Sequence, residues 1–326
     1  MARDSPPPAL ASLMDLIADI GATNSRLALL DDRGRPLALE TFENVLFTGI
    51  EGLLDVYLEH RRASDRPRRA ALAVAAPIAG DEVRMTNIPW RFSRAALAER
   101  LGLSELIVVN DFAAVAWALP DLGPGDAVQV GGGTPAPRAT LATLGPGTGL
   151  GVASLVPVRD GWAVVAGEGG HVTLPTTTAE EAAVAERLRN RHGHCSAERV
   201  LSGPGLVTLY ETLAELAGRP VAKITPRDVT GLARQGEPLA TRTIGMFLAM
   251  LGNVAGNLAL TVGALGGVYV AGGIVPRLLD TVHKSEFRER FEAKGRYRDY
   301  MEKIPTYVIT ERLPALRGLR RLLGYG

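Results

Sequence analysis

The hydrophobic pattern of the first part of the chain alternates short apolar runs with tight turns. Residues 16–30 read LIADIGATNSRLALL, which is an apolar run ending at Asp19, a turn containing Gly21, and a second apolar run. Two such runs joined by a glycine turn predict a β-hairpin. A turn at residues 31–35 and a third strand at 36–42 follow. The region is therefore predicted to begin as an antiparallel meander.

The next stretch mixes helical and strand patterns. Residues 50–62 place leucines and a tyrosine on one side of a helix, which predicts an amphipathic helix. Residues 70–76 and 106–109 are continuous apolar runs, typical of strands buried on both faces. A helix capped by Ser93 is predicted between these strands, and an apolar helix over residues 112–119 follows them. This order predicts mixed sheets flanked by helices.

The strand pattern starts again in the second half. Residues 121–137 are rich in Gly and Pro, which predicts a boundary between two lobes. Residues 140–156 then repeat the order of strand, glycine turn and strand. The remaining predicted elements are a strand at 162–166, helices from Thr178 to about 191, at 206–217, after Thr225 and after Pro238, strands at 267–271 and 304–309, and a closing helix at 313–323.

One long stretch, residues 243–276, contains no Asp, Glu, Lys or Arg and includes a GxxxG motif at Gly252 and Gly256. A transmembrane span is one interpretation of this pattern. Asn253, Asn257 and the turn-strand-turn pattern GGVYVAGG favour a buried core helix followed by a buried strand. We therefore expect no membrane association.

Length and composition set the broad class. A chain of 326 residues exceeds the usual size of one domain, so two domains with a cleft between them are expected. We expect residues 1–121, joined by a C-terminal helix at 312–326, to form a small α/β lobe, and residues 122–311 to form a large one.

Charge and cysteine content narrow the list of partners. The 36 basic and 35 acidic side chains give a formal charge of +1, which provides no field to attract nucleic acid. Five arginines between positions 61 and 69 are interpreted as a solvated loop. Cys195 is the only cysteine and no signal peptide is evident, which favours a cytoplasmic location.

The turn after the first strand has phosphate-binding chemistry. Gly21 allows a tight bend, so that backbone amides and the side chains of Thr23 and Asn24 can face an anion. Asp19 can hold a hydrated Mg²⁺ bound to phosphates. The alternative is a hairpin whose polar residues only satisfy the turn, and this motif alone does not decide between the two.

Two further glycine motifs strengthen the nucleotide interpretation. Gly147 and Gly149 flank Thr148 in the second hairpin, and Gly272 and Gly273 follow a third strand, where bare backbone lets a ring or ribose approach closely. Each could be an ordinary turn. Three glycine motifs at strand ends together predict nucleotide binding.

Polar residues at other strand ends suit phosphoryl transfer to a polyol. Asp111 follows a buried strand and precedes a helix, which suits the base that takes the proton of an acceptor hydroxyl. A helix cap is the alternative role for Asp111. The side chains that have the right chemistry to bind sugar hydroxyls are Asn110, Glu168, His171 and Glu198.

Seven motifs, taken in order, resemble the bacterial glucokinases of the non-zinc group, within the superfamily of sugar kinases, actin and heat-shock ATPases. The resemblance covers nearly the whole chain. The motifs are LIADIGATNSRLAL at 16–29, MTNIPWRFS at 85–93, VVNDFAAVAWALP at 108–120, LGPGTGLGVA at 144–153, GEGGHV at 167–172, SAERVLSGPGL at 196–206 and VYVAGGIVPR at 268–277.

The resemblance implies a two-lobed actin-like ATPase (ribonuclease H-like) fold that closes on sugar, and usually a homodimer. It implies phosphorylation of glucose at the 6-hydroxyl with ATP and Mg²⁺, a step of glycolysis, with Asp111 as the catalytic base. Glucose hydroxyls would be held by Asn87, Asn110, Asp111, Glu168, His171 and Glu198. Phosphates, Mg²⁺ and adenosine would be held by Asp19, Gly21, Ala22, Thr23, Asn24, Gly147, Thr148, Gly149, Gly272 and Gly273.

One departure separates the chain from a neighbouring family. The repressor, open-reading-frame and kinase group carries a zinc motif with several cysteines, which one cysteine cannot supply. His192, His194 and Cys195 leave an improvised zinc site as an alternative, but we expect no structural metal.

Other functions remain open at this point. A kinase for mannose, fructose or an N-acetylhexosamine would use the same polar residues, and ADP or polyphosphate could replace ATP as the donor. A sugar-sensing regulator without catalysis would carry an N-terminal DNA-binding domain, for which the first strand begins too early. A chaperone-like or filament-forming ATPase would lack the pairing of Asn110 with Asp111 and of Glu168 with His171.

Overall fold

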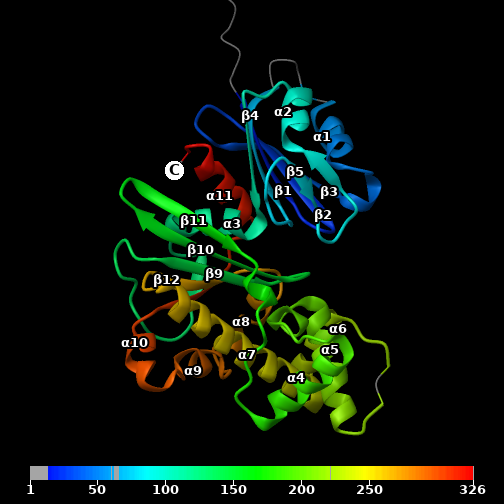
Figure 1. Cartoon of the computed structure of the whole chain (residues 1–326), viewed down its shortest axis with the longest axis vertical. Helices are drawn as coiled ribbons and strands as arrows, with labels where there is room; N and C mark the ends of the chain where they lie inside the picture. The colour runs from blue at the N-terminus through cyan, green and yellow to red at the C-terminus, as the bar shows by residue number, and fades with distance from the viewer. Residues whose placement is uncertain (1–13, 60, 62–65, 221, 326) are drawn as a thin grey trace, which may run out of the picture. The chain divides into compact units, whose positions relative to one another are not determined.

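A computed structural model describes residues 14–59, 61, 66–220 and 222–325. The chain divides into two compact units, which we call unit 1 (Met1–Ala114 and Ala315–Gly326) and unit 2 (Val115–Pro314). Figure 1 shows the elements of both units in chain order. The division falls inside the helix α3 (Asp111–Ala118).

Unit 1 is built on a five-stranded mixed sheet in the order β3-β2-β1-β4-β7. The predicted meander is confirmed, because β1, β2 and β3 pair antiparallel, whereas β1, β4 and β7 are parallel. The bounds are β1 (Met14–Ile20), β2 (Asn24–Leu30), β3 (Pro36–Glu43), β4 (Pro67–Val74) and β7 (Glu105–Asn110). A short hairpin, β5 (Glu82–Arg84) with β6 (Arg91–Ser93), forms a separate sheet.

The parallel register brings three strand ends to one edge of this sheet. Ile20 lies opposite Val74, and Val74 lies opposite Asn110. Adjacent strands lie about 4.8 Å apart, so the ends of β1 and β7 are separated by roughly 10 Å across the sheet. The turn after β1 and the start of α3 therefore leave the same edge.

Two amphipathic helices contribute to the core of unit 1. The helix α1 (Ile50–Glu59) buries Leu53, Leu54 and Tyr57 in the cluster formed by the sheet, as its pattern predicted. Its predicted end at residue 62 lies outside the described residues. The helix α2 (Arg94–Leu101) begins where predicted, since the Ser93 hydroxyl accepts a hydrogen bond from the Ala96 amide at 3.1 Å.

The interpretation of the arginine cluster as a solvated loop is wrong for Arg69, and Arg62 lies outside the described residues. Arg69 lies within β4, where its guanidinium binds the carboxylate of Asp15 and the carbonyl of Leu323. The Tyr325 hydroxyl also donates to Asp15, at 2.8 Å. Asp15 is buried and needs these partners, which the charge pattern could not reveal. The contacts hold the chain after α11 (Pro314–Leu322) against β1 and β4.

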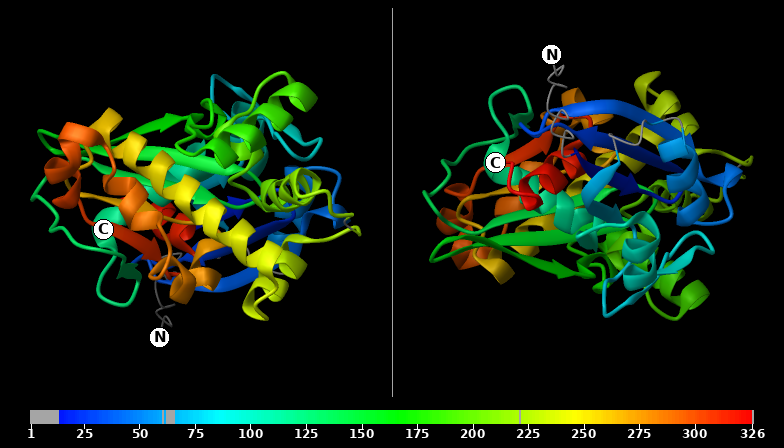
Figure 2. Two further views of the ribbon diagram at one scale, coloured as in Figure 1. Left: turned by 90° about the horizontal axis from the view of Figure 1, so that it is seen from below. Right: turned by 90° about the horizontal axis from the view of Figure 1, so that it is seen from above.

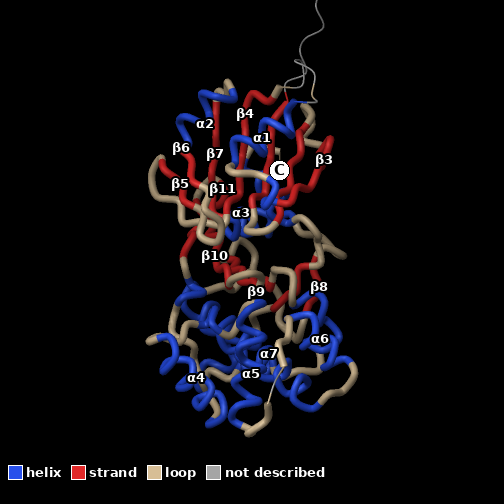
Figure 3. The backbone as a smooth tube through the Cα atoms, turned by 90° about the vertical axis from the view of Figure 1, so that its right-hand side faces the viewer, coloured by secondary structure: helices blue, strands red, loops and turns tan. Residues whose placement is uncertain are grey.

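Unit 2 is built on a six-stranded sheet in the order β11-β10-β9-β12-β13-β8. Figure 3 draws the strands in red and labels β8, β9, β10 and β11 of this sheet. The bounds are β8 (Ala127–Gln129), β9 (Leu141–Pro146), β10 (Leu150–Val158), β11 (Gly161–Gly167), β12 (Gly267–Val270) and β13 (Thr306–Ile309). The second glycine hairpin is confirmed as β9 and β10. The strand β8 was missed because it is short and lies in the Gly- and Pro-rich segment.

Helices pack on the apolar face of this sheet. The helix α7 (Pro238–Val262) is the long yellow helix of Figure 2. It shares one hydrophobic cluster with Ala142, Leu144, Val268 and Val270 of the strands. The helix bounds are α4 (Ala179–His192), α5 (Gly203–Leu216), α6 (Pro226–Arg234), α7 (Pro238–Val262), α8 (Leu279–Val282), α9 (Phe287–Glu292) and α10 (Arg298–Glu302). The predicted helix starts at Thr178 and Thr225 are confirmed, and the structure has a capping box at each, whereas α5 begins earlier than predicted, at Gly203.

The GxxxG motif serves close helix packing within unit 2. A Cβ atom on Gly252 would lie 2.0 Å from the carbonyl oxygen of Phe287, and one on Gly256 would lie 2.5 Å from that of Phe291. The two glycines therefore let α9 approach the backbone of α7. By length and composition, α7 alone among the described helices could span a membrane, but 72% of its most apolar window is buried. The predicted buried helix followed by a buried strand is confirmed.

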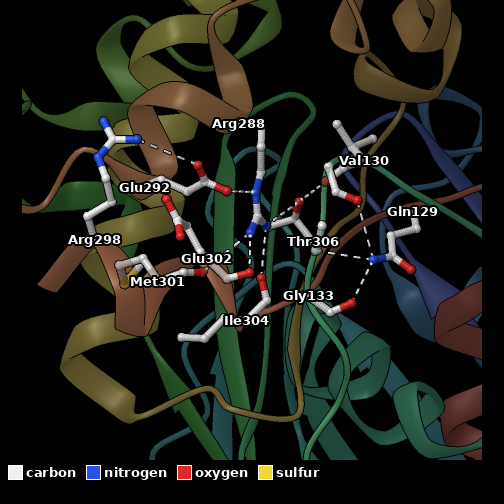
Figure 4. Close-up of polar contacts among 12 residues, drawn as sticks. Gln129, Val130, Gly133, Arg288, Glu292, Arg298, Met301, Glu302, Ile304 and Thr306 are labelled. Atoms are coloured by element: carbon white, nitrogen blue, oxygen red, sulfur yellow. Dashed lines mark hydrogen bonds and ion pairs between the residues drawn. The ribbon is translucent and has the colours of Figure 1, made fainter.

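An arginine of α9 ties three segments of unit 2 together (Figure 4). The guanidinium of Arg288 donates to the carbonyls of Ile304 at 2.8 Å and Glu302 at 3.1 Å. It also donates to the hydroxyl of Thr306 at 3.2 Å and pairs with Glu292 on its own helix. These bonds give the guanidinium of the half-buried Arg288 partners on three segments of unit 2.

Lys294 predicts a pH dependence of stability. Its amine donates to the side-chain and backbone oxygens of Asn253, and burial lowers its pKa from 10.5 to about 8. Between these two values the Lys294 amine binds more protons in the unfolded chain than in the folded chain, so its contribution to stability rises with pH from about 8 to 10.5. Lys294→Met should remove this rise, measured as the urea midpoint at pH 8 and pH 10. Lys284→Met, at an exposed lysine, should keep the wild-type rise; an unchanged rise in Lys294→Met would contradict the assignment.

Candidate functional site

The turn between β1 and β2 is tight and is braced by one buried side chain. The Gly21 amide donates to the Asn24 carbonyl at 3.1 Å. The Asn44 side chain donates to the Gly21 carbonyl at 2.8 Å, and its backbone amide donates to the Thr23 carbonyl at 2.9 Å. Ser25 in turn donates to Asn44 at 2.6 Å. Asn44 is only 3% exposed and was missed, because nothing in its sequence context marks it as a partner of the turn.

Asp19, at the end of β1, has a partly compensated charge. Its side chain is 19% exposed, and the guanidinium of Arg26 lies 3.4 Å from its carboxylate. Burial raises the pKa of Asp19 above its ordinary value, while Arg26 acts in the opposite direction. A carboxylate with a raised pKa gains from any further positive charge placed beside it, because the cation stabilises the ionised form. Asp19 is therefore suited to be a ligand of a cation, which it would bind directly or through a water molecule.

At the start of α3, the residue that caps the helix is Asn110, and the catalytic candidate Asp111 is a different residue. The Asn110 side-chain oxygen accepts hydrogen bonds from the amides of Phe112 at 2.9 Å and Ala113 at 3.2 Å, so Asn110 caps the helix. Asp111 is the first residue of α3, and its carboxylate accepts from the Phe112 amide at 2.9 Å. The cap is thus supplied by Asn110, which weakens the alternative that Asp111 serves only as a cap.

The segment that carries Asn87 reaches the same edge of the unit 1 sheet. The Thr86 amide donates to the carbonyl of Ala75, which directly follows β4, at 3.3 Å. Asn87 itself is exposed. Asn110 donates to the Ala76 carbonyl at 3.3 Å, so the ends of β4 and β7 are also joined. Unit 1 therefore gathers its predicted site residues along one sheet edge.

The second glycine turn, between β9 and β10, lies at the start of α5. The Gly147 amide donates to the Gly149 carbonyl at 2.8 Å, and the Gly203 amide donates to the Gly147 carbonyl at 2.8 Å. Ser202 caps α5 by accepting from the Gly205 amide at 3.0 Å. The positive end of the α5 dipole therefore lies beside the turn, which suits an anion. Sequence reasoning missed this contribution because it placed the helix start later.

Glu198 is attached to the same turn. The Leu150 amide donates to one carboxylate oxygen of Glu198 at 2.8 Å. The other oxygen lies 4.0 Å from Nδ1 of His171, and the side chains of His171 and Glu198 are 57% and 31% exposed. Both side chains thus keep polar surface for a ligand while Glu198 is anchored by a backbone donor.

Backbone hydrogen bonds join the two segments that carry the predicted sugar ligands of unit 2. The Ala197 amide donates to the Val172 carbonyl at 2.9 Å, and the Leu174 amide donates to the Cys195 carbonyl at 3.0 Å. The short helix η4 (Gly169–His171) follows Glu168 directly. The segments that carry Glu168, His171 and Glu198 therefore lie side by side.

The third glycine motif, Gly272 and Gly273, lies against the end of β9, next to the second glycine turn. Gly272 has φ +87°, and a Cβ atom there would lie 2.4 Å from the carbonyl oxygen of Pro146. The Ala271 amide donates to the Leu144 carbonyl at 2.8 Å. A Cβ on Gly273, by contrast, would meet no atom within 4 Å. Gly272 is required by the close approach of the backbone, and Gly273 leaves open space beside it.

The HGHC segment does not assemble a metal site in the described part of the chain. His194 contacts the hydroxyl of Thr173 at 3.1 Å, and Cys195 is buried with a pKa raised by that burial. No group of three or more His, Cys, Asp or Glu side chains with metal-binding geometry occurs among the described residues.

The two mixed sheets, each with a glycine turn at a strand end, define the class of sugar kinases with the actin-like ATPase fold. The glucokinase family model matches residues 16–324, and the chain belongs to this family. It is 45% identical to the glucokinase of Nitrobacter hamburgensis, over 94% of this chain and 96% of that protein.

Solved structures share the fold. The crystal structure of a glucokinase from an Antarctic psychrotroph matches with a TM-score of 0.84 and 36% identity, over 96% of this chain and 99% of that one. The ROK family glucokinase from Streptomyces griseus, solved in complex with glucose and AMPPNP, matches with a TM-score of 0.65 and 21% identity, over 96% of this chain and all of that one. At 21% identity, the similarity to the Streptomyces griseus structure shows a shared fold and nothing more.

Proposed function

We propose that this protein transfers a phosphoryl group from ATP to the 6-hydroxyl of glucose. The observation that carries the proposal is the hydrogen bond from the Leu150 amide to Glu198, because it attaches a sugar-binding carboxylate to a glycine turn suited to phosphates. A sugar sensor needs no phosphate turn, and a filament-forming ATPase needs no polyol cluster. Family membership supports the same activity.

Asp111 is proposed to act as the general base. In a loose phosphoryl-transfer transition state, the base orients the acceptor hydroxyl and takes its proton late. Asp111 begins α3 at the same edge of the unit 1 sheet as the turn after β1, among the other predicted site residues of this unit. Five further side chains are proposed to bind the sugar hydroxyls, namely Asn87, Asn110, Glu168, His171 and Glu198.

ATP and Mg²⁺ are proposed to bind through the glycine motifs and Asp19. The amides of Gly21, Ala22, Thr23 and Asn24 and those of Gly147, Thr148 and Gly149 would hold phosphates, and Gly272 and Gly273 would border the adenosine. When bound, Mg²⁺ neutralises the charge on the phosphates. The raised pKa of Asp19 fits this role, since a cation beside it would relieve the cost of its burial.

We further propose a cytoplasmic homodimer with glucose and ATP as its small-molecule partners. The single buried cysteine supports a reducing compartment. Sedimentation equilibrium tests the assembly, and the proposal predicts twice the mass of the 34.5 kDa chain.

The identity of the sugar is tested with a panel of glucose, mannose, fructose and N-acetylglucosamine. We expect glucose to give the highest kcat/KM in an ADP-release assay, because the carboxylates of Glu168 and Glu198 and the ring of His171 form a fixed set of hydroxyl partners. A kinase for another hexose is the second candidate. A higher kcat/KM with mannose or N-acetylglucosamine would support that candidate and reject glucose.

A further inference from the structure

Gly149 lies where the carboxylate of Glu198 needs space. An ideal Cβ atom on Gly149 would lie 2.4 Å from the Glu198 oxygen that accepts from the Leu150 amide, and 3.2 Å from the carboxylate carbon. The backbone of Gly149 is not in the left-handed region, so φ does not require glycine here. Glycine at position 149 is therefore explained by the space that the Glu198 carboxylate occupies, and not by the backbone conformation of the turn.

Backbone contacts hold the segments on either side of this carboxylate. The Glu198 carbonyl accepts from the Ser202 hydroxyl at 2.9 Å, which holds its backbone at the start of α5. On the other side, a Cβ on Gly170 would lie 2.1 Å from the Leu150 carbonyl oxygen, so η4 packs directly on Leu150. Leu150 therefore contacts both segments of the sugar-binding cluster, one through its amide and one through its carbonyl.

We propose that Gly149 and the Leu150 amide are positioning elements for sugar binding, which act by setting the location of the Glu198 carboxylate. This inference rests on the proposed function. It assigns to the glycine turn a second role in addition to its contact with phosphates. A methyl group at position 149 displaces the end of a flexible side chain, so it moves the carboxylate at little cost to the fold.

The direct test is Gly149→Ala, with glucose binding measured by calorimetry in the absence of nucleotide and with KM and kcat measured separately. We expect the glucose dissociation constant and KM to rise roughly ten- to a hundredfold, as for loss of a charged hydrogen bond. The melting temperature should stay within a few degrees of wild type. Unchanged glucose affinity would overturn the proposal.

Gly132→Ala is the matched comparison, in the exposed loop after β8 and outside the proposed binding residues. A Cβ there would meet no atom within 4 Å, and Gly132 is not in the left-handed region. We expect this variant to bind glucose, without nucleotide, within about twofold of wild type, as for a change that removes no contact. An equal loss of glucose affinity in both variants would mean that the loss does not depend on the space beside Glu198 and would overturn the specific role of Gly149.

A double-mutant cycle with Glu198→Ala tests whether Gly149 acts through Glu198. If it does, Gly149→Ala adds little to the loss already caused by Glu198→Ala. If Glu198→Ala impairs glucose binding and the two effects multiply, only this inference fails. If Glu198→Ala binds glucose like wild type, the sugar-binding role of Glu198 in the proposed function fails as well.

A readout that does not depend on Gly149→Ala folding is the hydrogen exchange of the Leu150 amide. The proposal predicts protection in the wild type and faster exchange in Glu198→Ala, because the amide loses its acceptor. Equal exchange rates in the two proteins would overturn it.

Discussion

Asp111→Asn is expected to lower kcat by about a thousandfold, the range found when a general base is removed. The asparagine keeps the size of the side chain and an oxygen that can accept from the Phe112 amide, so α3 should start as in the wild type. Only the ability to take a proton is lost. The expected signature in steady-state kinetics is therefore a large fall in kcat with a small change in the glucose KM.

A second aspartate at a helix start provides the control. Asp228 belongs to the capping box of α6 and is exposed, with its carboxylate bound to Thr225. Asp228→Asn should lower stability slightly and leave kcat near that of the wild type. If Asp111→Asn turned over glucose within about fivefold of wild type, far short of the loss expected for a missing base, another group would have to take the proton.

Gly252→Ala is expected to destabilise unit 2 by about 3 kcal/mol, the upper end of the usual cost of overpacking. The added methyl group would lie 2.0 Å from a backbone carbonyl oxygen of Phe287, which no side-chain rotation can relieve. The helix α9 would have to move away from α7, and the packing of the buried Phe287 and Phe291 would be lost with it. The measurement is the midpoint of urea unfolding, followed by circular dichroism.

Gly245→Ala on the same helix is expected to have the opposite sign. Gly245 is exposed, and a Cβ there would meet no atom within 4 Å. Alanine in place of glycine within an exposed helix stabilises by up to about 1 kcal/mol. Equal urea midpoints for the two variants would show that the contact between α7 and α9 does not control the stability of unit 2.

Several elements could be read from the sequence because local signals agree there. The hairpin of β1 and β2, the helix starts at Thr178 and Thr225, and Pro238 at the start of α7 each combine a hydrophobic pattern with an end signal. Short elements lack such agreement. The strand β8 has three residues between glycines, and α9 and α10 have six and five residues, so their stability comes from tertiary contacts such as those of Arg288.

Sequence reasoning could predict the side chains of the candidate site, but not the backbone groups and the spaces that position them. Glu168, His171 and Glu198 were proposed from their chemistry, and the structure brings them together within unit 2. The Leu150 amide could not be found in this way, because a backbone donor carries no residue-type signal. Gly149 was assigned to phosphates alone, since the space it leaves for Glu198 is visible only when the two segments are placed side by side.

The most direct test of the central claim is to measure ADP and glucose 6-phosphate together after mixing the purified protein with ATP, Mg²⁺ and glucose. The account predicts equal amounts of both products, with no ADP above background when glucose is omitted. Release of ADP at the same rate without sugar, or no product when all components are present, would contradict it.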